Sequence, residues 1–136
     1  MKAADFMVGD WYANSDGDLC KVVKNLGNIV CGQGDDVSDS TDDPNPILLT
    51  SEILEKNGFV QIEDGFANFD LPEGCWQNDN ALCGINFNDR AMFYTFSIDP
   101  EDDNLQNKII GICFVYQLQQ ALRLCGLNEL ADNFKV

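Results

Sequence analysis

The chain has 136 residues, of which 45% are hydrophobic and 10% aromatic, so it is long enough to bury a hydrophobic core without disulfides or a structural metal. It carries 23 acidic and 8 basic residues, which gives a net charge of -15. This charge repels nucleic-acid phosphates and anionic lipids, and the basic residues are scattered, which argues against direct binding to nucleic acid or membranes. A basic protein partner is compatible with it, although solubility is the simpler explanation of the excess carboxylates.

The first ten residues include Asp5 and Asp10, which interrupt the apolar run that a secretory signal peptide requires. No stretch of the sequence approaches the ~20 apolar residues of a membrane helix. We therefore expect a cytoplasmic protein whose six cysteines stay reduced.

The sequence contains no histidine and no Cys-x-x-Cys pair. Catalytic arrangements that pair serine or cysteine with histidine are therefore excluded, as are the common zinc sites. With 23 acidic residues, chance carboxylate pairs are inevitable, so no pair is assigned to acid–base catalysis without a cleft around it. We assign no catalytic, cofactor-binding or metal-binding residue and expect a protein that is not an enzyme.

Residues 8–31 predict a meander of short strands. Residues 10–13 and 19–24 are strand-like, a third strand begins at Ile29, and Asp, Asn and Gly supply the turns between them. The Gly-Asp-Trp opening and the close spacing of the strands suggest a small SH3-like barrel. The sequence does not decide whether this barrel closes. The oxygen-rich turn at 14–18 lacks the spacing of a calcium loop, so we interpret it as a hairpin turn.

An acidic segment rich in glycine and proline, residues 35–46, predicts a loop without a packed element. It divides a single domain into a β meander at 1–34 and an α+β part at 47–136. The acidic segments 35–43 and 99–103 could each hold a cation weakly, but a solvated loop is the favoured interpretation of both.

The second part predicts a mostly antiparallel sheet with two short helices, so the fold class is α+β. The first helix begins after Thr50 or Ser51 and ends at Asn57-Gly58, with Phe59 packed beneath its end. The strand-like segments are 59–62, 66–71, 81–87, 91–98 and 108–115, and a second helix covers 116–125. Residues 127–136 fit either a short helix or an edge strand.

Four residues form a candidate interaction surface. They are Trp76, Tyr116, Gln117 and Gln120. The tryptophan lies in a polar stretch, where core anchoring is an equal alternative to exposure. The others belong to the second helix, whose spacing turns its glutamines, Gln119 included, and Arg123 away from the core. A solvated helix face without a partner is the favoured alternative.

Two short motifs carry a family resemblance. They are Pro-Ile-Leu-Leu-Thr-Ser-Glu-Ile-Leu-Glu-Lys-Asn-Gly-Phe at 46–59 and Val-Tyr-Gln-Leu-Gln-Gln-Ala-Leu at 115–122. In this order, after a strand meander, they resemble a family of small proteins of unassigned activity from gut anaerobic bacteria and their phages. The chain departs from the family pattern at Tyr116, where the family has histidine. The resemblance implies a phage or mobile-element context and supplies no catalytic residues.

Three functional hypotheses follow. The first is a non-enzymatic interaction or adaptor module of phage or mobile-element origin. The second is an acidic mimic of nucleic acid that inhibits a basic host protein. The third is a small hydrolase that uses carboxylates and a divalent metal. The sequence leaves the partner and the oligomeric state open.

Overall fold

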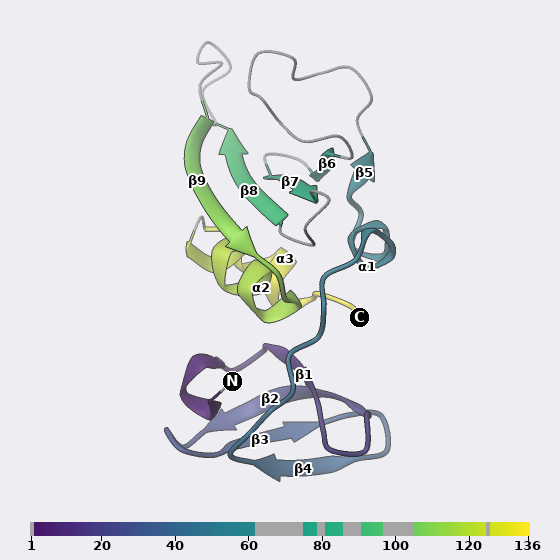
Figure 1. Cartoon of the computed structure of the whole chain (residues 1–136), viewed down its shortest axis with the longest axis vertical. Coiled ribbons are helices and arrows are strands. Elements are labelled where there is room, and N and C mark those ends of the chain that lie inside the picture. The colour runs from purple at the N-terminus through teal and green to yellow at the C-terminus, as the bar shows by residue number, and fades with distance from the viewer. Residues whose placement is uncertain (1, 62–74, 79–80, 86–90, 97–104, 125) are drawn as a thin grey trace.

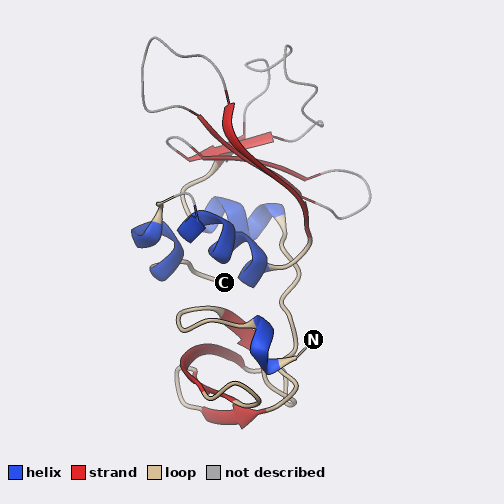
Figure 2. Cartoon of the chain, turned by 90° about the vertical axis from the view of Figure 1, so that its left-hand side faces the viewer, coloured by secondary structure: helices blue, strands red, loops and turns tan. Residues whose placement is uncertain are grey.

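The computed structural model describes residues 2–61, 75–78, 81–85, 91–96, 105–124 and 126–136. It contains two antiparallel sheets, and the α-helices lie between them (Figures 1 and 2). The predicted α+β class is confirmed. Within the described residues, no helix has the length and apolar character needed to cross a membrane.

The amino-terminal sheet follows a short 3-10 helix, η1 (Ala3–Asp5). Its strands are β1 (Trp11–Ala13), β2 (Leu19–Asn25), β3 (Val30–Gln33) and β4 (Ser38–Thr41), paired in that order. The predicted meander is therefore confirmed. After β4 the chain returns to β1, where Ala13 and Asn45 exchange two backbone hydrogen bonds of 2.8 and 3.1 Å.

The strand β4 corrects the prediction that residues 35–46 form a loop without a packed element. Val30 of β3 pairs with Thr41, and Gln33 pairs with Ser38, at the two ends of the β3–β4 ladder. Neither Ser38 nor Ser40 is buried, so β4 lacks the apolar alternation that usually marks a strand. The backbone groups of β4 that face β3 pair with that strand, and composition alone does not reveal this pairing.

The second sheet has the order β5-β6-β7-β8-β9. Its strands are β5 (Val60–Gln61), β6 (Cys75–Asn78), β7 (Ala81–Ile85), β8 (Ala91–Phe96) and β9 (Leu105–Ile112). The predicted β7–β8 hairpin is confirmed, but β6 was not predicted. The segments 66–71 and 99–103 lie outside the described residues.

Three α-helices complete the fold: α1 (Ser51–Lys56), α2 (Val115–Leu124) and α3 (Asn128–Asp132). The predicted start of α1 is confirmed, because the Thr50 hydroxyl accepts a hydrogen bond from Ile53 N at 3.3 Å. The helix α3 resolves the choice between helix and edge strand for residues 127–136 and adds a third helix to the two predicted.

The buried apolar side chains form two clusters, and α2 contributes to both. Leu118 and Leu122 of α2 pack into the cluster that includes Leu54 of α1. Tyr116, on another side of the same helix, packs with Phe6 and the inner face of the amino-terminal sheet. The helix α2 is thus the element that both halves share.

Candidate functional site

The Asn-Gly-Phe end of the first motif terminates α1. Gly58 has a φ of +81°, and its N–H donates to Glu55 O at 3.1 Å, while Phe59 N donates to Leu54 O at 3.1 Å. This is a Schellman motif, which requires the left-handed conformation that glycine adopts most easily. Phe59 is buried, as predicted, so the motif has a structural explanation.

Asn57 ties the end of α1 to two distant segments. Its Nδ2 donates to Ile53 O at 2.8 Å and to Lys135 O at 2.7 Å, and its Oδ1 accepts from Lys135 N at 2.7 Å. The backbone carbonyl of Asn57 in turn accepts a hydrogen bond of 2.7 Å from Asn78 Nδ2 of β6. One asparagine therefore connects α1, β6 and the carboxyl-terminal residues.

The second motif begins α2. The Gln117 Oε1 atom accepts hydrogen bonds from Cys113 N at 2.8 Å and Phe114 N at 3.0 Å, so it satisfies N–H groups just before the first turn. Tyr116 is buried, and the centroid of its ring lies 4.3 Å from the centroid of the Phe6 ring. Burial, followed by the charges of Asp5 and Asp10, raises the pKa of Tyr116.

Gln119 corrects the prediction that all polar residues of α2 face away from the core. Its side chain is fully buried. Its Oε1 accepts from Trp11 N at 2.9 Å, and its Nε2 donates to Gly9 O at 2.8 Å and Ala131 O at 3.1 Å. The amide fits there because it satisfies three backbone groups that the packing of β1 and α3 against α2 removes from water.

Arg123 and Asp10 form the charged part of the same junction. Asp10 is fully buried, and its Oδ1 accepts from Arg123 Nη1 at 2.5 Å. Its Oδ2 accepts from Gln120 Nε2 and Met7 N, both at 2.8 Å. Arg123 also reaches Asp132 at 3.4 Å, so the side chain predicted to face away from the core instead joins three segments.

One nitrogen of this arginine is unusual. Arg123 Nη2 is buried and makes no hydrogen bond within the described part of the chain. A Cβ atom at Gly9, which has a φ of +94°, would lie 2.8 Å from this nitrogen. Only glycine fits the position without displacing Arg123.

The four residues of the candidate interaction surface do not share an exposed face. Trp76 is 7% exposed and belongs to the cluster around α2 and α1, whereas Tyr116 is 5% exposed and belongs to the amino-terminal cluster. Gln117 caps α2, and Gln120 donates to Asp5 O and Asp10 Oδ2. The hydrogen bonds of Gln120 could not be predicted from the sequence, because its partners Asp5 and Asp10 lie more than 100 positions away. Contact of these residues with a partner stays a prediction.

The inner face of the amino-terminal sheet also holds a polar pair. The Tyr12 hydroxyl donates to Asp39 Oδ2 at 2.7 Å, and burial together with this bond raises the pKa of Tyr12. Burial, followed by the charge of Asp39, raises the pKa of Cys20. A buried thiol that stays protonated is a poor nucleophile, so Cys20 acts as a core residue.

Four exposed carboxylates lie on two turns at one end of this sheet. The β1–β2 turn carries Asp16 and Asp18, and the β3–β4 turn carries Asp35 and Asp36, all exposed. The two turns are adjacent, since a Cβ atom at Gly34 would lie 2.5 Å from the carbonyl oxygen of Leu19. We call these four aspartates and the exposed Leu19 the acidic end of the sheet.

The β1–β2 turn is held by Asn14. Its Oδ1 accepts from Asp16 N at 3.0 Å and Asp18 N at 2.8 Å, and its backbone N–H donates to Asp18 O at 2.9 Å. The interpretation of residues 14–18 as a hairpin turn is therefore confirmed. Within the described residues, no group of three or more acidic, cysteine or histidine side chains is arranged to hold a metal ion.

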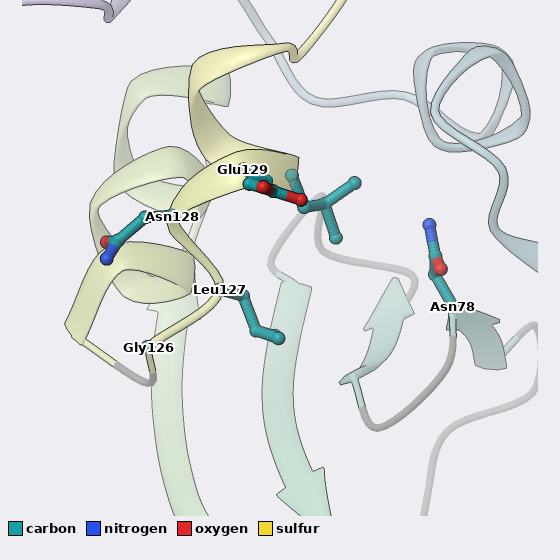
Figure 3. A pocket seen from close by; sticks show the side chains of 6 residues that line it. Asn78, Gly126, Leu127, Asn128 and Glu129 are labelled. Carbon is teal, nitrogen blue, oxygen red and sulfur yellow. The ribbon is translucent and has the colours of Figure 1, made fainter.

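A pocket of about 410 Å3 lies between the α2–α3 turn and β6 (Figure 3). It is lined by Asn78, Gly126, Leu127, Asn128, Glu129 and Leu130. In Figure 3 the side chains of Leu127 and Glu129 extend towards Asn78, and that of Asn128 points to the other side. The pocket could not be predicted from the sequence, because Asn78 is distant in the chain from the other lining residues, 126–130.

Comparisons of the chain with protein-family models, with curated proteins and with solved structures give no match.

Proposed function

We propose that this chain is a non-enzymatic interaction module that binds a basic protein surface through the acidic end of its amino-terminal sheet. The observation that carries the proposal is that two adjacent turns place four exposed aspartates at one end of the sheet, where Leu19 is also exposed. An exposed apolar residue on the same end of the sheet as four carboxylates fits a partner segment that combines an apolar residue with lysine or arginine.

The rigidity of the turns supports this proposal. Asn14 fixes the backbone of the first turn through three hydrogen bonds, and Gly34 N donates to Val37 O at 2.8 Å in the second. Carboxylates on preformed turns lose little conformational entropy on binding. The net charge of -15 would also attract a basic partner over distances near the Debye length, about 8 Å at physiological salt.

The finer features of the proposal rest on the sequence. We interpret the four-stranded sheet as an SH3-like module. The bridge between Ala13 and Asn45, where the chain returns to β1 after β4, supports this interpretation. We place the protein in the cytoplasm, in a phage or mobile-element context. Its partner would then be a protein of the bacterial host or of the element itself.

A second candidate uses the same acidic end. If the partner's basic surface normally binds nucleic acid, the chain would act as a nucleic-acid mimic and inhibit that protein. The same four aspartates support this alternative, because they lie together at one end of the sheet. The carboxylate- and metal-dependent hydrolase has no comparable support among the described residues and is not proposed further.

The test is capture of a partner from host lysate, followed by direct binding measurements with the purified partner. Replacement of Asp35 and Asp36 by asparagine should weaken binding by roughly four- to 25-fold, the product of two exposed ion pairs, and flatten its salt dependence. The matched control replaces Glu52 and Glu55, which are exposed on α1, by glutamine and removes the same charge. Equal weakening by the two double variants would refute a specific role for the acidic end.

The second candidate is distinguished by competition. A nucleic-acid mimic must displace DNA or RNA from the captured partner, and D35N/D36N must lose this ability in proportion to its lost affinity. A partner that binds this chain and nucleic acid at the same time supports the interaction module and excludes the mimic.

A further inference from the structure

The pocket beside α3 has walls that the fold holds in place. Gly126 N donates to Arg123 O at 3.1 Å and Leu127 N donates to Leu122 O at 2.8 Å, which is a second Schellman motif at the end of α2. This turn sets the position of Leu127. Leu127 and Leu130 are half-buried and pack against the hydrophobic cluster around α2, so their remaining surface is available to the pocket.

The polar side chains that face each other across the pocket bring acceptors. One of the two N–H groups of Asn78 Nδ2 donates to Asn57 O at 2.7 Å, which holds the amide in place, and its carbonyl oxygen is an acceptor for a ligand. Glu129 is exposed, and its carboxylate extends towards Asn78 (Figure 3). A carboxylate accepts hydrogen bonds and carries negative charge at neutral pH.

We propose that this pocket binds the cationic end of an aliphatic chain, an ammonium or guanidinium group on a stem of several methylenes. Glu129 pairs with the charge, the Asn78 carbonyl oxygen accepts a hydrogen bond, and Leu127 and Leu130 contact the stem. Lysine and arginine side chains have this amphipathic form, as do free alkylamines. The volume of about 410 Å3 is within the range of small-ligand sites.

Other ligand classes fit less well. An anion would be repelled by Glu129 and by the net charge of -15. A neutral apolar ligand would remove the Glu129 carboxylate from water without a compensating partner. The proposal does not rest on the proposed function, because the pocket is formed by α3 and β6 and contains no residue of the acidic end.

The test is an NMR titration of the full-length chain with n-butylguanidinium and n-pentylammonium. 1-Pentanol serves as the neutral probe and valerate as the anionic probe. For cations of this size we expect saturation with a dissociation constant on the order of a few millimolar. The largest amide shifts should lie at Gly126–Leu130 and Asn78.

The variant Glu129→Gln should weaken cation binding roughly two- to fivefold, the range of an exposed ion pair. Glu52→Gln, which removes the same charge from an exposed position on α1, should leave it unchanged. Equal effects of the two variants, or shifts that do not saturate or that spread over exposed aspartates elsewhere, would overturn the proposal.

A blocked Gly-Arg-Gly peptide then separates the two sources of the cation. Saturable, Glu129-dependent binding of the peptide assigns the pocket to a side chain of another protein. Binding of the small cations without the peptide assigns it to a free ligand. The absence of saturation with every cationic probe refutes the site, whatever the outcome for the acidic end.

Discussion

The buried amide of Gln119 offers the sharpest test of how the two halves are joined. Replacement by leucine keeps the approximate volume but removes three hydrogen bonds, to Trp11 N, Gly9 O and Ala131 O. A buried polar group without a partner costs about 1–3 kcal/mol. Because Gly9 and Trp11 are half-buried and regain some water, we take about 1 kcal/mol for each group and expect Gln119→Leu to lower the free energy of unfolding by about 3 kcal/mol.

Urea unfolding followed by far-UV circular dichroism measures this loss. With a slope of about 1.5 kcal/mol per molar urea, the midpoint should fall by about 2 M. The control Gln33→Leu places the same change on an exposed position of β3 and should alter stability by less than about 0.5 kcal/mol. If Gln119→Leu stays within 0.5 kcal/mol of Gln33→Leu, the amide does not hold the junction and our account of α2 is wrong.

Two further predictions concern backbone conformation and alkaline pH. Gly9→Ala should destabilise the protein by about 1–2 kcal/mol more than Gly17→Ala in the same urea assay, because both glycines have positive φ but only a Cβ at Gly9 meets Arg123; equal losses would contradict the close contact. Because the pKa of Tyr12 and that of Tyr116 are raised in the folded state, their contribution to stability is complete below pH ~10 and is lost as pH rises above it, by up to about 1.4 kcal/mol per pH unit for each tyrosine. Tyr116→Phe should reduce this slope by up to one proton in urea unfolding between pH 10 and 11.5, and an unchanged slope would contradict a raised pKa of Tyr116.

Local signals in the sequence predicted the ends of the helices well. Thr50 and Gly58 mark the start and end of α1 because capping is chemistry between residues three to five positions apart. The hairpin turn at 14–18 was also predictable, since Asn14 bonds the backbone of its own turn. The residues of the two motifs that carried the family resemblance have structural roles of this local kind. Asn57 and Gln119 add hydrogen bonds to distant segments.

Strand pairing and the burial of polar residues were decided by tertiary structure. The polar strand β4 exists because β3 supplies its hydrogen bonds, although its own residues give no apolar alternation. The pocket of Asn78 and Glu129 likewise depends on the packing of distant elements.

The sequence by itself determined the α+β class, the acidic surface and the helix termini, because composition and short-range backbone chemistry are sufficient for these. Only the tertiary structure decided that Gln119 and Asp10 are buried while four aspartates converge at one end of a sheet. The physical reason is that the free energy of a polar side chain depends on its partners. Gln119 finds one of its partners, Gly9, 110 positions away along the chain.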